Sequence, residues 1–222
     1  MTFVARTYDD PCGLARALNL VGDRWALLVV RELLLGPKRF SDLRRGLPGA
    51  SQSMLTQRLT ELEHAGVLGR RQLGPPTSTW VYELTESGHA LAPALLELAR
   101  WGSRTPLTST VEMSVDALAL ALRTTFDAAA AGDLRARCSL VVDGDRLVAT
   151  VEDGRFGIVR AEADAVDAEL ESSAAALRAL VFTDEDVATA EAAGRVTVRG
   201  CRVVAARFLT LFPRPTPTGP HA

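Results

Sequence analysis

A three-residue break between two short amphipathic segments constrains the fold of this chain more than any other feature. Ser41 can cap a helix predicted over residues 42–47, and residues 48–50, Pro-Gly-Ala, interrupt the pattern. Ser51 can then cap a second helix, predicted over residues 52–66. Two helices joined by a short turn that contains glycine are typical of a helix-turn-helix motif.

Two more helices are predicted upstream of this motif. Apolar residues recur at helical spacing over residues 12–21, and Gly22 ends that pattern. Asp23 can cap the next helix, whose broad apolar stripe continues to Leu34 before Gly-Pro stops it at residue 36. The motif is therefore expected to pack against two preceding helices.

The segment downstream of the motif alternates between apolar and polar residues. Residues 67–73 and 80–85 are predicted to be strands, joined by a six-residue loop, 74–79. A last helix is predicted over residues 86–101, with Leu91, Leu95 and Leu98 turned inward. Helices, a helix-turn-helix, a β-hairpin and a final helix make up a winged helix, which is mainly α.

The second helix of the motif is predicted to have two contrasting faces. Leu55, Leu59 and Leu62 define the buried one. The opposite face carries short or amide side chains that can approach base edges, and Gln can contact adenine at two points. Any single arginine of this region could equally be a solvated surface side chain or a member of an internal ion pair instead of a DNA contact. The expected DNA-binding residues are Arg39, Arg44, Arg45, Ser51, Gln52, Ser53, Thr56, Gln57, Arg58, Arg70, Arg71 and Thr79.

Short motifs of specific order and spacing run through the first half. They are Cys12, Ala15-Arg16-Ala17-Leu18, Gly22-Asp23-Arg24-Trp25, Arg31-Glu32-Leu33, Arg39-Phe40, Leu43-Arg44, Leu55-Thr56-Gln57-Arg58-Leu59, Leu62-Glu63, Ala65-Gly66, Tyr82 and Leu84-Thr85. Over about residues 8–104 the chain resembles the HxlR family of bacterial transcriptional regulators. The resemblance implies a homodimer, built from the terminal helices of this domain, that binds a palindromic operator in double-stranded DNA.

Two departures from the family pattern lower the expected attraction for phosphate. Ser53 stands where the family commonly has Lys, and residues 77–79, Thr-Ser-Thr, stand where it has a Pro-Pro-Arg-like wing. Each phosphate that a protein neutralises adds about 0.9 to the salt dependence of duplex binding. Nonspecific affinity is therefore expected to be lower than is usual for the family.

The second half is predicted to be an α+β domain. Asp-Gly pairs separate alternating runs, which is a strong hairpin signal, and helical segments surround these runs. A meander of strands with helices on one face is expected. The predicted strands are 137–142, 147–152, 155–161, 168–171 and 195–199; the helices are 114–131, 174–182 capped by Ser173, one reaching 194 and capped by Thr183 or Asp184, and 202–212.

Several motifs of the second half are similar to those of the sterol carrier protein type 2 fold, over about residues 112–212. They are Val142-Asp143-Gly144, Val151-Glu152-Asp153-Gly154, the run from Gly194 to Gly200, and Arg207-Phe208-Leu209. The resemblance implies an apolar tunnel for a small apolar or lipid-like ligand. Side chains that could line it are Phe126, Phe156, Ile158, Phe182, Phe208 and Phe212, although an ordinary packed core would use the same residues.

Charge also divides the chain into two parts. Residues 1–105 carry 13 Lys and Arg against 10 Asp and Glu, a net charge of +3, whereas residues 106–222 carry 12 against 17, a net charge of −5. Only the first part is compatible with a nucleic acid partner. We predict a DNA-binding domain over 1–105, a sterol-carrier-like domain over 106–213 and a disordered tail over 214–222.

Other classes of protein are disfavoured by the composition. No apolar run reaches the ~18 residues of a membrane-spanning helix, and the first ten residues lack the apolar core of a secretory signal. Three dispersed cysteines and three dispersed histidines predict reduced thiols in a cytoplasmic protein with no metal site and no cofactor. No catalytic constellation is present, so an enzyme is not expected.

Three functions are left open by the sequence. The first is a transcriptional regulator, repressor or activator, that is modulated by a small apolar ligand in the second half. The second is a redox-sensing regulator acting through Cys12, because Cys12 resembles an N-terminal cysteine that some HxlR members use as a sensor; a small packed thiol is the plain alternative. The third is a lipid-binding carrier, which would have no need of a recognition helix.

Overall fold

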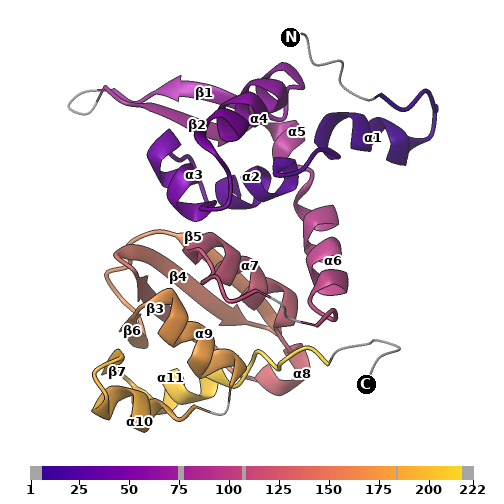
Figure 1. Cartoon of the computed structure of the whole chain (residues 1–222). Coiled ribbons are helices and arrows are strands. Elements are labelled where there is room, and N and C mark those ends of the chain that lie inside the picture. The colour runs from indigo at the N-terminus through magenta and orange to yellow at the C-terminus, as the bar shows by residue number, and fades with distance from the viewer. Residues whose placement is uncertain (1–6, 75–77, 107–108, 184, 217–222) are drawn as a thin grey trace. The chain divides into compact units, whose positions relative to one another are not determined.

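The computed structural model describes residues 7–74, 78–106, 109–183 and 185–216 (Figure 1). Four predicted features fall partly or wholly outside this set: the first six residues of the chain, the wing loop at 75–77 with Thr77, the helix cap at Asp184, and the tail from 217 onward. The chain forms two compact units, residues 1–95 and 96–222. The division falls inside a helix, so the domain boundary expected at 105 stays a prediction.

The first unit has the element order of a winged helix. The hairpin is antiparallel, with Leu68 opposite Leu84 and Gln72 opposite Trp80. Lys38 and Tyr82 exchange backbone hydrogen bonds in both directions, which adds an isolated β-bridge to the second strand of the hairpin. The elements are α1 (Gly13–Val21), α2 (Ala26–Leu33), α3 (Phe40–Gly46), α4 (Gln52–His64), β1 (Leu68–Gln72), β2 (Trp80–Leu84) and α5 (Glu86–His89), followed by α6 (Ala92–Gly102), which contains the division between the units.

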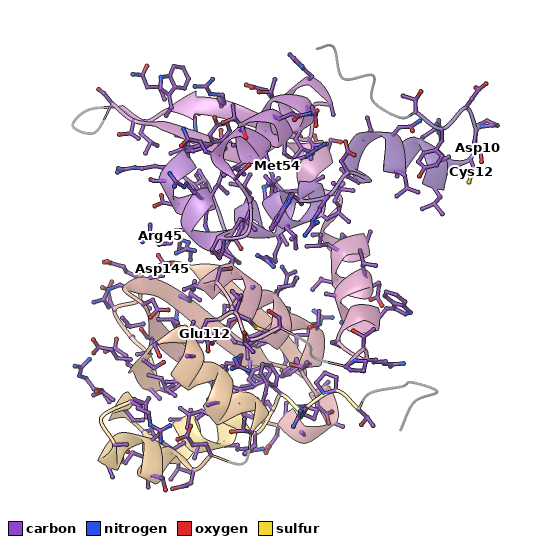
Figure 2. All side chains as sticks on the ribbon, in the orientation of Figure 1. Asp10, Cys12, Arg45, Met54, Glu112 and Asp145 are labelled. Carbon is purple, nitrogen blue, oxygen red and sulfur yellow. The ribbon has the colours of Figure 1, made fainter. Side chains whose placement is uncertain are left out.

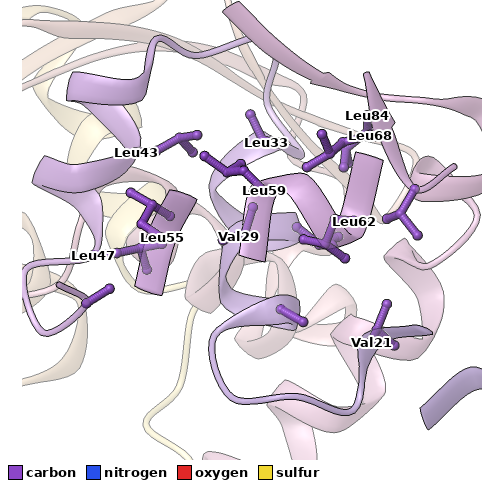
Figure 3. Packing of buried hydrophobic residues seen from close by; sticks show 14 residues of the cluster. Val21, Val29, Leu33, Leu43, Leu47, Leu55, Leu59, Leu62, Leu68 and Leu84 are labelled. Atoms are coloured by element: carbon purple, nitrogen blue, oxygen red, sulfur yellow. The ribbon is translucent and has the colours of Figure 1, made fainter. Parts of the chain in front are cut away.

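One apolar cluster holds the first unit together (Figure 3). Leu55, Leu59 and Leu62 of α4 are at most 1% exposed, as the periodicity of that helix predicted. They meet Val29 and Leu33 of α2, which are fully buried. Burial of a side chain of this size contributes about 1.5–3 kcal/mol, so α4 is held by its inner face and leaves its outer face for other contacts.

Two predicted caps in the first unit are wrong. Asp23 does not cap α2. Trp25 stands at the N-cap position, in a left-handed backbone conformation with φ +80 and without a side-chain cap hydrogen bond, and the Asp23 side chain pairs with an arginine instead. Ser41 lies inside α3, because that helix begins earlier, after Arg39, whose backbone N–H donates to the Asp42 carboxylate at 3.3 Å.

The predicted last helix is two helices. Thr85 caps α5, which ends at His89, and α6 begins at Ala92 with Pro93 in its first turn, where the missing N–H is tolerated. Leu95 is buried as predicted, but Leu98 is 49% exposed. The inward face predicted for one continuous helix is therefore wrong at Leu98.

The second unit is an α+β structure built on a five-stranded sheet of order β5-β4-β3-β6-β7 (Figure 1). The expected meander holds only for the first three strands, since β6 returns to pair in parallel with β3. Helix α11 packs against β6, β3 and β7. The elements are α7 (Val115–Thr125), α8 (Ala128–Ala131), β3 (Ala136–Val142), β4 (Asp145–Glu152), β5 (Arg155–Arg160), β6 (Ala168–Ser172), α9 (Ala174–Phe182), α10 (Val187–Ala192), β7 (Val196–Gly200) and α11 (Arg202–Leu209).

The two Asp-Gly turns of the sheet are confirmed. Asp143 and Asp153 both have φ +50, and the glycines after them have φ +86 and +68. Two successive residues at positive φ are what a two-residue hairpin of type I′ needs, and Asp and Gly accept that conformation most readily. These turns fix the register of the β3-β4 and β4-β5 pairs.

Two helices of the second unit begin where the sequence did not predict them, and α11 ends at Leu209 rather than at residue 212. The helix expected over 114–131 breaks at Asp127, whose carboxylate accepts from two backbone N–H groups of a new helix, α8. Asp186, not Thr183, caps α10. In both places a capping carboxylate starts a short helix that apolar periodicity alone does not reveal.

Candidate nucleic-acid interface

The turn of the helix-turn-helix is shaped by a tryptophan. A Cβ added to Gly49 would lie 2.9 Å from the ring of Trp25, so this position has no room for a side chain. Two residues further on, the Ser51 hydroxyl accepts from the backbone N–H of Met54 at 3.3 Å and caps α4, as predicted. Packing against Trp25 and this cap together fix where α4 begins.

The outer face of α4 is short and polar. Gln52, Ser53 and Thr56 are exposed, in agreement with the sequence. Gln57 is only half-buried and is already engaged, because its amide nitrogen donates to the Glu61 carboxylate at 2.9 Å. The exposed face therefore begins at the N-terminal end of α4, where Met54 also reaches the surface (Figure 2).

Arg58 does not belong to this face. Its side chain is 9% exposed and pairs with Asp23 at 2.6 Å and with Glu61. The positive charge of an arginine that is buried between two carboxylates is already offset and is not accessible to a phosphate. We therefore remove Arg58 from the expected DNA-binding residues, since its role is to connect α4 to the segment before α2.

Arg44 and Arg45 of α3 stand beside the N-terminal end of α4, and Arg39 immediately precedes α3. Arg39 and Arg44 are exposed, and no carboxylate of the described chain lies within ion-pair distance of either. Arg45 is exposed too but pairs with Asp42. An open hollow of about 910 Å³ is lined by Phe40, Ser41, Arg44, Arg45, Pro48, Gly49, Ala50, Ser51 and Gln52.

The wing contributes Arg70, Arg71 and Thr79, all on or next to the hairpin. Arg71 is bound to Glu83, and the hydrogen bond to that carboxylate raises the pKa of Arg71. The backbone carbonyl of Thr79 accepts from the N–H of Leu73 at 2.8 Å, which closes the hairpin beyond its last strand pair. Trp80 and Glu83 were not predicted from the sequence to be functional. The signal that could have found them is their position on β2, across the predicted hairpin from Arg70 and Arg71.

Four of the five aromatic residues expected to line a tunnel form a cluster of contacting rings. Phe126, Phe156, Phe208 and Phe212 contact one another, with ring centroids as close as 5.2 Å, and Phe208 and Phe212 are each 1% exposed. Ile158 is buried as well. Ile158, Phe208 and Phe212 therefore belong to the close-packed core, whereas Phe126 and Phe156 are half-buried.

Phe182 lies apart from that cluster. It is half-buried and, with Leu180, Leu209 and Phe212, lines an open hollow of about 450 Å³ on the second unit. Within the described residues, no group of three or more His, Cys, Asp or Glu could hold a metal ion. No helix in the same part of the chain is long and apolar enough to cross a membrane.

The three cysteines differ in their surroundings. Cys12 is exposed at the start of α1, next to Asp10, whose carboxylate accepts from the Cys12 backbone N–H at 2.8 Å (Figure 2). Cys201 is exposed at the start of α11. Burial raises the pKa of the Cys138 thiol to about 12, which leaves it almost entirely protonated at neutral pH. Only the two exposed thiols are therefore accessible to an oxidant.

Comparison with known proteins identifies the family. The HxlR-like helix-turn-helix family matches residues 20–108. The HTH-type transcriptional regulator YkvN of Bacillus subtilis is 40% identical over 91 residues, which cover 41% of this chain and 77% of YkvN. The chain belongs to the HxlR-like helix-turn-helix family. This HxlR-like regulator is also similar to YodB of the same organism, at 38% identity over 88 residues, covering 40% of this chain and 79% of YodB.

Solved structures are also similar to part of this HxlR-like protein. The redox regulator HypR in its oxidized form is 32% identical, with a TM-score of 0.41, and covers 44% of this chain and 100% of HypR. The reduced form of YodB is 35% identical, with a TM-score of 0.39, and covers 43% of this chain and 94% of YodB. The chain is a transcriptional regulator of the helix-turn-helix class, and its relatives are regulators rather than enzymes.

Proposed function

We propose that this HxlR-like regulator binds a palindromic operator and that the N-terminal half of α4 enters the major groove. The observation that carries the proposal is the outer face of α4, where Gln52, Ser53 and Thr56 are exposed on a helix whose opposite face is fully buried. Recognition helices read base edges with their N-terminal residues. Arg39 and Arg44 stand where they can contact the phosphate backbone beside that helix.

Base readout and phosphate contact predict different mutational effects. Replacing Gln52 with Ala is expected to reduce discrimination between operator and scrambled DNA by about 1–3 kcal/mol, because it removes a contact to a base edge. Replacing Arg44 with Ala should weaken binding to both DNAs alike, because phosphates carry no sequence information. Fluorescence anisotropy titrations with both duplexes measure the two effects. Arg155→Ala, an exposed arginine of the second unit, is the matched control; small and equal effects of Gln52→Ala and Arg44→Ala would contradict the assignment.

A homodimer is the second part of the proposal. Leu14, Leu18 and Leu20 of α1 are 40–68% exposed, and Leu98 and Trp101 of α6 are 49% and 70% exposed. Large apolar side chains exposed in groups are typical of interfaces. These are the terminal helices of the HxlR-like region, and each carries an apolar face through which two copies can pair and present two recognition helices to one palindrome.

Redox sensing through Cys12 is supported by the exposure of its thiol, and names of relatives such as the redox regulator HypR are compatible with it. On this proposal, diamide treatment should change the DNA affinity of the native protein and leave that of Cys12→Ser unchanged. Cys201→Ser, the other exposed thiol, should behave like the native protein. If Cys12→Ser still responds to diamide as the native protein does, Cys12 is not the sensor.

Sensing of a small apolar ligand by the second unit is supported by one hollow that two of the expected ligand-binding residues line. Of the six residues expected from the sterol-carrier resemblance, Ile158, Phe208 and Phe212 are buried and the other three are half-buried, and only Phe182 and Phe212 line the open hollow. A ligand of the second unit would therefore bind in that hollow. Mass spectrometry of the native protein would detect such a molecule if it co-purifies.

A further inference from the structure

The wing carries two adjacent arginines whose surroundings are opposite in character. Arg70 and Arg71 are neighbours on β1, and successive side chains of a strand point to opposite faces. Arg70 therefore shares a face with Tyr82, its partner across the hairpin, while Arg71 shares the other face with Glu83. The hairpin gives two chemically identical side chains different partners.

The charge of Arg71 is offset within the wing. Its Nε donates to both carboxylate oxygens of Glu83, at 3.0 and 3.1 Å. Such a pair holds the guanidinium along the strand and places a negative charge beside it. A phosphate that approached Arg71 would be repelled by Glu83 at the same time.

Arg70 is held without being neutralised. Its guanidinium carbon lies 5.1 Å from the ring centroid of Trp80 and 5.5 Å from that of Tyr82. In the part of the chain that the structure describes, no carboxylate lies within ion-pair distance of the Arg70 guanidinium. Aromatic faces attract a guanidinium through their quadrupole, and they leave its N–H edge and its full charge available.

The aromatic pair is itself anchored at its inner end. The Tyr82 N–H donates to the carbonyl of Lys38 at 2.8 Å, and the Lys38 N–H donates back at 2.9 Å. Trp80 lies two pairs further toward the tip of the wing and is 50% exposed. The stack therefore projects Arg70 from a part of the wing that the fold holds in place.

We propose that Arg70 is the phosphate contact of the wing and that Trp80 and Tyr82 are positioning residues that order its side chain before DNA binds. Glu83, through its ion pair, keeps Arg71 from contacting DNA. This inference rests on the proposed function of the first unit. An arginine that is already ordered before binding loses less side-chain freedom when it meets a phosphate. The stack thus raises DNA affinity without touching DNA.

A double-mutant cycle tests whether Trp80 acts through Arg70. Trp80→Leu is expected to weaken DNA binding by about twofold to twelvefold per copy, the range given by ordering one long side chain. Arg70→Gln should lower the slope of log affinity against log salt by about 0.9 per copy. The double variant should bind no more weakly than Arg70→Gln alone, because Trp80 has nothing left to position.

Two further variants separate positioning from a general structural effect. Trp80→Phe keeps an aromatic face, so it should restore most of the affinity lost in Trp80→Leu. Glu83→Gln releases Arg71 and should strengthen binding and steepen the salt slope, whereas Arg71→Gln should change both little. Circular dichroism melting of each variant checks that the wing remains folded.

Several results would overturn the inference. Additive effects of Trp80→Leu and Arg70→Gln would mean that Trp80 contacts DNA itself or supports the fold. An Arg71→Gln loss as large as that of Arg70→Gln would mean that Glu83 does not withdraw Arg71. If native protein binds no duplex at all, the proposed function itself fails; if it binds but the cycle is additive, only the role of the stack fails.

Discussion

Replacing Glu32 with Ala is expected to lower the free energy of unfolding of the first unit by about 3–5 kcal/mol, the usual cost of removing one partner of a buried ion pair. The Glu32 side chain is fully buried, and its two carboxylate oxygens accept from Lys38 and Arg31, each at 2.8 Å. These cations are only 11% and 17% exposed, so the substitution would leave two poorly solvated positive charges beside an empty volume.

Hydrogen–deuterium exchange of α2 and α4 in the full chain measures this effect on the first unit alone. Arg45→Ala is the matched control in the same unit, because the Arg45 side chain is 77% exposed where it pairs with Asp42, and such surface pairs contribute little. Gly46→Ala should also destabilise the unit, since an added Cβ would lie 2.1 Å from a Glu32 carboxylate oxygen. A loss below about 1 kcal/mol for Glu32→Ala would contradict the account of this network.

Replacing Phe208 with Ala is expected to destabilise the second unit by about 3–5 kcal/mol, as for other large aromatic residues removed from a packed core. Its ring is 1% exposed and contacts the rings of Phe156 and Phe212. Exchange protection of β3 and β6 reports the change, and Val203→Ala, 77% exposed on the same helix, is the control. A loss comparable to that control would mean that Phe208 faces a cavity, as the sterol-carrier resemblance implied.

The winged helix could be predicted because its signals are local. The break before Ser51, the leucine face of α4 and the alternation of the hairpin each lie within a few residues, and each is confirmed. Arg58 could not be placed in this way. Periodicity set it on the flank of α4, but its partner Asp23 lies 35 residues away and is brought near only by the packing of the helices.

The second unit shows the same limit. Strands bounded by Asp-Gly turns were located within one or two residues, whereas the parallel return of β6 beside β3 has no local signal. The phenylalanines were identified as interior residues. Whether an interior apolar residue faces a packed neighbour or a space depends on ring-to-ring contacts, which composition and spacing do not encode.

Selection of binding sites from a randomised duplex library by the full chain tests the central claim most directly. Two copies that read DNA with α4 should enrich one two-fold symmetric sequence whose half-sites are centred 34–36 Å apart, about one turn of the helix. The selected duplex should then bind at least ~10³-fold more tightly than a scrambled one at physiological salt. Enrichment of no sequence, or equal affinity for the selected and scrambled duplexes, would contradict the account.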